Sequence, residues 1–376
     1  MNNYLKYILF LCIGSLAIAC DSSDDKDGDW MKSIEFRGVV RVGAVSFKIG
    51  DDVYVGLGHD EERLYGEKEM RDFYRFDAAT ESWAEVDSFP GEGRYGAVAF
   101  VIGNKAYVGT GYRPERNNFT QSPWTGNDTV IKQDKKYYND FYVFDGETQS
   151  WDTIPLGESN SALKFPGKGI RYGVAFSVAG KGYVGTGAVD ANTVVNDFYS
   201  FDPQNGWADA KFPGDSRKGA TAFVIGDSAI VCLGVADSYR TDVWLLRGKT
   251  GEWVRKNPLV NRSSHGYDDS YSKIQRAYAG SFVSDIHAGK DGQLGYVVCG
   301  LGDYNRTCWT YSMRRDRWYD VTSLPSQMAS PKVAPVAFSV NGYGFITTGG
   351  SSVETAKYRD TWKFIPGIEE DDYNDY

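Results

Sequence analysis

The sequence predicts an all-β fold in which six copies of one four-stranded unit form a ring, a six-bladed β-propeller. Three repeated features predict it: a strand that ends in glycine, an aromatic strand that usually has an Asp at its start, and a tryptophan that opens the next strand. The 376 residues include 43 glycines, and 15% are aromatic, which argues against disorder and against collagen. A sheet that is apolar on both faces must pack between neighbours, and a closed ring of such sheets meets this need.

The repeated unit is clearest in its second copy. A first strand over Arg94–Gly103 is followed by a second over Ala106–Gly111, and a variable loop leads to a third over Asn139–Asp145. A fourth strand, Ser150–Ile154, opens at a tryptophan. The six second strands are expected to end at Gly58, Gly111, Gly187, Gly234, Gly302 and Gly349.

Tryptophans indicate how the ring closes. Fourth strands open at Trp83, Trp151, Trp207, Trp253 and Trp318, which leaves one unit without its tryptophan. The segment Trp30–Gly38 has the same Trp-to-Phe-to-Gly spacing as Trp83–Gly91. We therefore expect the N-terminal segment to be the outer strand of the last unit, where it pairs with the C-terminal strands and covers their edge.

These four strand patterns together resemble kelch repeats: an Arg-led first strand, a glycine-rich second, a Tyr/Phe-Asp third and a Trp-led fourth. The resemblance covers residues 30–366 and implies a kelch-type propeller as one domain. A fold of this kind says little about chemistry, so function has to come from the site.

The N-terminal residues read as an export signal. Residues 1–19 contain Lys6, an apolar stretch and a small-residue approach to Cys20. This arrangement resembles the bacterial lipobox, in which Cys20 would be the lipid-attachment site, acylated for example with palmitate; the alternative is an ordinary signal peptide. The acidic tether at 20–29 resembles the signal that sends lipoproteins of Bacteroidetes-type bacteria to the outer cell surface, which predicts a surface-facing outer-membrane protein, or alternatively a periplasm-facing one.

The distribution of charge argues against nucleic acid as a partner. The net charge of -9 lies mostly in the tether and in the acidic tail at 367–376, so no basic stripe predicts nucleic-acid binding. Only the lipid anchor would contact a membrane, and we expect a monomer.

Of the three cysteines in the body, Cys299 and Cys308 either form a disulfide across a loop or stay free, and Cys232 has no obvious partner. With three histidines and no CxxC spacing, we expect no metal and no cofactor.

One rim of the propeller carries the long loops. It holds the connections between second and third strands and those between blades, which include residues 112–138 with Trp124 and residues 257–275 with His265 and Tyr267. Long loops usually carry function, so these three residues are candidate ligand contacts.

A basic residue also precedes each first strand on this rim. The six are Arg41, Arg94, Arg171, Arg217, Arg276 and Lys332. They lie six residues before the Phe of the strand, except Arg171, which lies five before Phe176. One interpretation is a cationic ring that binds an anionic or polyhydroxylated ligand.

The other interpretation is structural. Each cation would pair with the Asp that begins a third strand, at Asp72, Asp140, Asp197, Asp242 or Asp360. Blade five has Thr307 instead, so the sequence predicts an unpaired Arg276 or neighbour and a ligand edge there.

Three function classes fit such a chain. The first is a surface lipoprotein that binds a glycan, an acidic sugar or a protein partner on the loop rim, without catalysis. The second is a sugar mutarotase similar to bacterial N-acetylneuraminate epimerase, with His265, Asp268, Asp269 and Arg276 as candidate acid, base and carboxylate-binding groups. The third is a copper oxidase like galactose oxidase, which would need His59 and His265 to meet. We expect the first.

Overall fold

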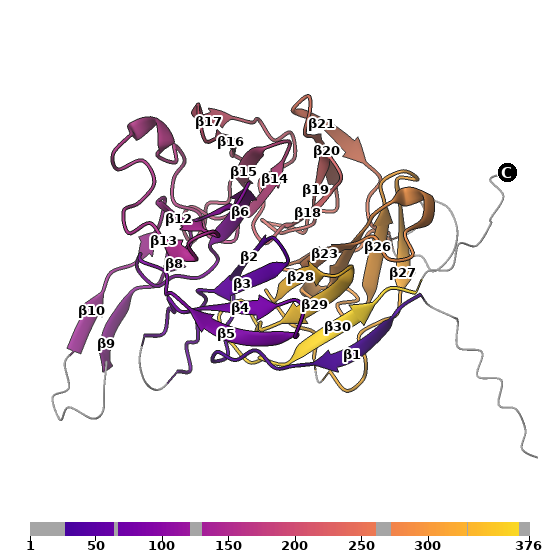
Figure 1. Ribbon diagram of the computed structural model, residues 1–376, viewed down its shortest axis with the longest axis horizontal. Coiled ribbons are helices and arrows are strands. Elements are labelled where there is room, and N and C mark those ends of the chain that lie inside the picture. The colour runs from indigo at the N-terminus through magenta and orange to yellow at the C-terminus, as the bar shows by residue number, and fades with distance from the viewer. Residues whose placement is uncertain (1–26, 64–66, 121–129, 261–271, 329, 368–376) are drawn as a thin grey trace, which may run out of the picture.

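Six four-stranded antiparallel sheets surround a central axis, which confirms the predicted six-bladed β-propeller (Figure 1). The structure is a computed structural model that describes residues 27–63, 67–120, 130–260, 272–328 and 330–367. Helix in these ranges is limited to two short 3-10 turns, η1 (Ser161–Leu163) and η2 (Gly289–Asp291). No helix in the described part of the chain is long and apolar enough to cross a membrane.

Each blade extends from an innermost strand at the axis to an outermost strand at the periphery. Blade one contains, in that order, β2 (Val45–Ile49), β3 (Asp52–Gly56), β4 (Phe73–Asp77) and β5 (Ser82–Val86). Blade two contains β6 (Val98–Ile102), β7 (Lys105–Gly109), β12 (Phe141–Asp145) and β13 (Ser150–Trp151). Blade three contains β14 (Val174–Val178), β15 (Lys181–Gly185), β16 (Phe198–Asp202) and β17 (Gly206–Asp209).

The second half of the chain repeats this order. Blade four contains β18 (Thr221–Ile225), β19 (Ser228–Cys232), β20 (Val243–Arg247) and β21 (Glu252–Lys256). Blade five contains β23 (Gly280–Ser284), β24 (Leu294–Val298), β26 (Cys308–Ser312) and β27 (Arg317–Val321). Blade six contains β28 (Val336–Val340), β29 (Tyr343–Thr347), β30 (Thr361–Ile365) and, outermost, β1 (Asp29–Ser33).

Three two-stranded ribbons lie on the loop rim. β8 (Tyr112–Arg113) pairs with β11 (Lys136–Tyr137), and β9 (Arg116–Thr120) pairs with β10 (Val130–Gln133). The β9–β10 hairpin extends away from the body of the propeller (Figure 1). In blade five, β22 (Arg276–Ala277) pairs with β25 (Leu301–Gly302).

The N-terminal strand closes the ring as the tryptophan spacing predicts. β1 pairs antiparallel with β30, with Asp29 opposite Ile365 and Ser33 opposite Thr361, and Figure 1 shows the indigo β1 beside the yellow β30. Trp30 is buried, and its indole Nε1 donates a hydrogen bond to the Thr322 carbonyl of blade five. The first and last described strands thus complete one sheet, and this pairing closes the ring.

Backbone hydrogen bonds also join each blade to the next. A glycine shortly after each second strand donates its backbone N–H to a backbone carbonyl of the next blade. That carbonyl belongs to a residue a few positions before the blade's first strand. The six bonds are Gly58 to Arg94, Gly111 to Ile170, Gly187 to Arg217, Gly234 to Arg276, Gly300 to Lys332 and Gly349 to Arg41. Gly300, not the predicted Gly302, is therefore the equivalent glycine of blade five, and its φ of 95° resembles that of Gly58 at 99°.

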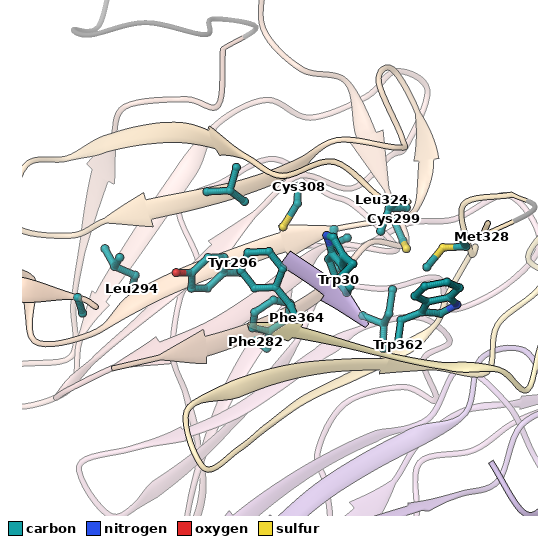
Figure 2. Packing of buried hydrophobic residues seen from close by; sticks show 14 residues of the cluster. Trp30, Phe282, Leu294, Tyr296, Cys299, Cys308, Leu324, Met328, Trp362 and Phe364 are labelled. Atoms are coloured by element: carbon teal, nitrogen blue, oxygen red, sulfur yellow. The ribbon is translucent and has the colours of Figure 1, made fainter. Parts of the chain in front are cut away.

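Aromatic side chains fill the space between neighbouring sheets. In five blades the Phe of the first strand stacks on an aromatic ring of the second, at centroid distances of 4.9–5.4 Å; an example is Phe282 with Tyr296. Figure 2 shows Phe282 and Tyr296 of blade five beside Phe364 of blade six, at centroid distances of 5.9 and 5.4 Å, and Phe364 in turn contacts Trp30. A glycine in the next blade makes this approach possible: at Gly182, a Cβ would lie 2.2 Å from the Phe100 ring.

Candidate functional site

Five of the six predicted cations lie inside the blades, not at the channel mouth. Each has no exposed side-chain surface: Arg41, Arg94, Arg217, Arg276 and Lys332. Four of them meet the Asp that begins the third strand, in the pairs Arg41–Asp72, Arg94–Asp140, Arg217–Asp242 and Lys332–Asp360. Their burial leaves no surface for a ligand, and the geometry is that of the structural interpretation.

The Arg41–Asp72 pair shows how these cations are held. Nη1 and Nη2 of Arg41 lie 2.9 and 2.8 Å from the two carboxylate oxygens of Asp72, and the Leu57 carbonyl accepts a further bond. The guanidinium lies over the Phe36 ring, 4.9 Å from its centroid. Burial tends to raise the pKa of Asp72, but the hydrogen bonds and charge of Arg41 outweigh this and lower it.

Arg276 has no carboxylate partner among the described residues, as Thr307 in place of Asp predicts, but it is not free to bind a ligand, because it is fully buried and hydrogen-bonded. Its guanidinium donates to the carbonyl oxygens of Asp303, Tyr304 and Thr307, and Nη2 also reaches the Thr307 hydroxyl at 2.9 Å. Neutral oxygens therefore replace the carboxylate of the other blades. Because burial outweighs the electrostatic effects of Asp303 and of the Cys299 and Cys308 thiols, the pKa of Arg276 falls to about 10.

Arg171 is the predicted cation that reaches the channel mouth. Ile170 takes the buried position in blade three, and Arg171, one residue later, turns to the other side of the chain. Its Nη1 donates to the Tyr95 hydroxyl at 2.9 Å and to Glu354 Oε1 at 3.0 Å. Its guanidinium also lies 4.5 Å from the centroid of the Tyr112 ring. Blades two, three and six thus meet at this cation.

Tyrosines surround Arg171. Tyr95 donates from its hydroxyl to Glu354 Oε2 at 2.5 Å, and Tyr172 donates to the Val353 carbonyl at 2.8 Å. The Tyr278 ring packs edge-on against Tyr172, 4.9 Å away. Burial raises the pKa of Tyr278 to about 12, and it raises the pKa of Tyr95 still further, so both hydroxyls stay protonated at neutral pH.

Lys218 supplies a second cation at the mouth. It precedes the first strand of blade four at the position that Arg171 has in blade three, and it is half-buried. Within the described ranges, no acceptor or carboxylate pairs with its ammonium. Burial and the nearby charge of Arg171 lower the pKa of Lys218, and Glu354 partly offsets them. Among these three described residues, the two cations Arg171 and Lys218 face one anion, Glu354.

A buried charge network joins this mouth to the edge of blade one. The His59 ring is 1% exposed and stacks on Tyr95, with centroids 4.6 Å apart. Its Nδ1 donates to Glu69 Oε1 at 2.8 Å, and Arg116 Nη1 donates to the same carboxylate at 2.6 and 2.8 Å. Burial tends to raise the pKa of Glu69, but His59 and Arg116 outweigh it and lower that pKa. The carboxylate is therefore ionised.

Several predicted site residues lie outside the described residues. These are Cys20, Trp124, His265, Tyr267, Asp268 and Asp269. The three body cysteines are all free and buried, so Cys299 and Cys308 do not pair. In the described part of the chain no group of three potential ligands is placed to hold a metal ion.

Sequence reasoning did not identify the residues that lie near Arg171. Tyr95, Glu354 and Lys218 come from three different blades, and no spacing in the sequence links them. One signal was available: Arg171 lies five residues before its Phe, where the other cations lie six before. In an extended chain a shift of one residue turns a side chain to the opposite face, so this Arg was already distinct from the rest.

Comparisons with known proteins bear on the fold. No protein-family model matches the sequence, and no curated protein matches it. A solved structure titled "Structure of YjhT" is similar, with a TM-score of 0.62 and 17% sequence identity. The alignment covers 88% of this chain and 95% of that chain. The likeness spans the whole propeller and supports the six-bladed architecture.

Proposed function

We propose that this protein is an envelope-anchored propeller lipoprotein that binds an acidic sugar at its channel mouth. The observation that carries the proposal is that two cations, Arg171 and Lys218, lie near one another at the mouth. Five blades bury their cation inside the sheet, whereas Arg171 stands at the mouth beside a second cation that has no partner among the described residues. Two adjacent cations whose mutual repulsion is not fully balanced favour an anionic ligand.

The surrounding groups suit a sugar that carries a carboxylate. The guanidinium of Arg171 is already oriented by Tyr95 and Glu354, so little side-chain freedom is lost when an anion binds. Half-buried Tyr112, Tyr137 and Tyr239 offer aromatic surface and hydroxyls beside it. A few placed polar groups within aromatic surroundings are typical of small-ligand sites.

A second candidate function is sugar mutarotation, the activity of bacterial N-acetylneuraminate epimerase, to which we compared the sequence above. The side chain of Glu354 is 49% exposed and accepts from both Tyr95 and Arg171, so one solvent-accessible carboxylate lies beside the proposed carboxylate-binding cation. Such a group can move a proton at an anomeric hydroxyl while Arg171 holds the acid group. Polarimetry on freshly dissolved sugar tests this: Glu354→Gln should remove any acceleration of mutarotation by the wild type.

Binding at the mouth is tested by calorimetry with the purified full-length protein. The probes are N-acetylneuraminate and galacturonate, with galactose as the neutral counterpart. Acidic sugars should bind and galactose should not, and Arg171→Gln or Lys218→Gln should weaken binding about tenfold, which corresponds to 1.4 kcal/mol. Lys249→Gln is the matched control, because Lys249 is an 81% exposed lysine in the β20–β21 turn. If neither acidic sugar binds, the proposal is overturned, and a protein partner from the cell envelope becomes the alternative.

The anchor is a separate part of the proposal. Cys20 follows the small residues of the export signal, and the acidic tether from 20 to 29 leads to β1, which begins at Asp29. Acylation at Cys20 would hold the propeller at the outer membrane, facing the cell surface or the periplasm. Mass spectrometry of the mature N-terminus tests it, since a diacylated Cys20 is expected and cleavage elsewhere would contradict it.

A further inference from the structure

A pocket of about 380 Å³ lies between blades one and two. The β3–β4 loop, the connection from β5 to β6 and the β8–β9 segment form its walls. At Gly93 the connection lies against the β3–β4 loop so closely that a Cβ would be 2.1 Å from the Glu69 carbonyl oxygen. The volume falls in the range of small-molecule sites, which is roughly 300–1,000 Å³.

The lining of this pocket is charged and of both signs. The principal charged residues are Arg71, Arg113, Arg116, Glu67, Glu69 and Glu92. Each Arg makes an ion pair with one of these acids: Arg71 with Glu67, Arg113 with Glu92, and Arg116 with Glu69. Guanidinium groups donate to carboxylates and hydroxyls, whereas carboxylates accept from hydroxyls. A ligand with many hydroxyls and an acid group can use both kinds of partner.

A chain of contacting side chains leads from this pocket to Arg171. Glu69 lines the pocket and bonds His59, His59 stacks on Tyr95, and Tyr95 accepts a hydrogen bond from Arg171. The Tyr112 ring also lies between the two places. It is 4.5 Å from the Arg171 guanidinium, and the charges of both Arg171 and Arg116 act on its hydroxyl. The pocket and the mouth are therefore linked through three side chains, Glu69, His59 and Tyr95.

We infer that the pocket is a second subsite, so that the ligand is an acidic oligosaccharide of at least two units. One acidic unit binds at Arg171 and Lys218, and the neighbouring unit fills the pocket, where Arg71 and Arg113 meet its acid group and the Glu side chains accept from its hydroxyls. This inference rests on the proposed function, because it extends the same site. A peptide is less well matched, since the described residues that line the pocket are mostly charged and include no aromatic side chain to anchor an apolar residue.

Calorimetry with ligands of increasing length tests the subsite. The probes are galacturonate, digalacturonate and trigalacturonate, together with N-acetylneuraminate and its α2,8-linked dimer, on the purified full-length protein. In the wild type, Kd should fall about tenfold from one unit to two, as expected for one added charged hydrogen-bond pair. In Arg71→Gln and Arg113→Gln the gain should shrink to about twofold or less, while Kd for the single unit stays unchanged.

Arg247→Gln is the matched control for Arg71→Gln. Arg71 and its partner Glu67 are 46% and 50% exposed, and Arg247 and its partner Glu252 are 56% and 58% exposed at the opposite rim. The control should leave both affinities and the length dependence intact. A thermal melt of each variant shows whether it folds.

The possible failures are distinguishable. If the wild type binds one unit and two units equally, the pocket is not a subsite, although the proposed function stands. If a length gain persists in both pocket variants, the second unit binds elsewhere and the inference is overturned. If no acidic sugar of any length binds, the proposed function fails and the inference fails with it.

Discussion

Ile170 occupies in blade three the backbone position that Arg94 occupies in blade two, and the carbonyl oxygen of each accepts the same inter-blade hydrogen bond. Arg94 is fully buried against Asp140, whereas Ile170 packs in the apolar core between blades two and three. Asp197, the counterpart of Asp140, is left exposed beside a cavity of about 10 Å³. Blade three therefore has Ile170 where blade two has Arg94, and it lacks the Arg–Asp ion pair. Its Arg is the next residue, Arg171, whose side chain lies at the mouth.

Exchanging these two residues should have unequal effects on stability. Arg94→Ile removes the partner of Asp140 and the guanidinium that stacks on Tyr138, so the free energy of unfolding should fall by about 3 kcal/mol. Ile170→Arg also costs stability, because it replaces an apolar side chain of the core beside a cavity of only about 10 Å³, but it gives Asp197 a partner, so the loss should be smaller, about 1–2 kcal/mol. Urea denaturation measures both. Equal losses in the two variants would contradict this account of the pair.

The blades and their closure could be predicted because their signals are local and repeated. Tryptophan spacing alone identified β1 as the outer strand of blade six, and the register of Asp29 with Ile365 confirms it. The site could not be predicted in the same way. Tyr95, Lys218 and Glu354 meet at Arg171 only because the ring brings loops of blades two, four and six together.

Blade five offers a test of how the buried cations are stabilised. Thr307 stands where Asp242 and Asp360 stand, and Trp309 donates to it at 2.7 Å just as Trp362 donates to Asp360 at 2.6 Å. Thr307→Asp should raise the pKa of Arg276 and increase the free energy of unfolding by about 1–2 kcal/mol. Thr307→Asn keeps an acceptor without charge and is the control. If urea denaturation gives the same value for both variants, charge pairing is not what matters there.

The two interpretations of the six cations could not be separated from the sequence. Both rested on the same spacing of Arg and Asp, and spacing does not show whether a side chain turns into a blade or toward the axis. The structure separates the two groups by burial, with Arg41 enclosed and Arg171 partly open. Three loop residues proposed as contacts, Trp124, His265 and Tyr267, lie outside the described residues.

Acid should destabilise the propeller through the half-buried carboxylates that pair with its buried cations. Arg41, Arg217 and Lys332 outweigh the effect of burial and lower the pKa of Asp72, Asp242 and Asp360, respectively. A carboxyl whose pKa is lower in the folded state contributes stability at pH values above its pKa in the unfolded chain, which is about 4. That contribution is lost as pH falls through the pKa of the folded state. Urea denaturation between pH 7 and pH 2.5 should therefore show a progressive loss below about pH 4. Asp72→Asn should be less stable at pH 7 and show a shallower loss, and a parallel curve would contradict the assignment.

Alkaline pH should weaken binding of an acidic sugar through Lys218. Burial and the charge of Arg171 lower the pKa of this lysine below 10.5, and a bound carboxylate would raise it again by favouring the charged form. Binding above neutral pH should then take up a proton, and affinity should fall as pH rises from 7 to 10. Calorimetry in two buffers of different ionisation enthalpy measures this uptake directly. Lys218→Arg should keep the affinity and lose the pH dependence, because a guanidinium stays charged throughout this range, whereas Lys218→Gln should lose both. Unchanged wild-type affinity between pH 7 and pH 10 would mean that the anion does not bind at Lys218.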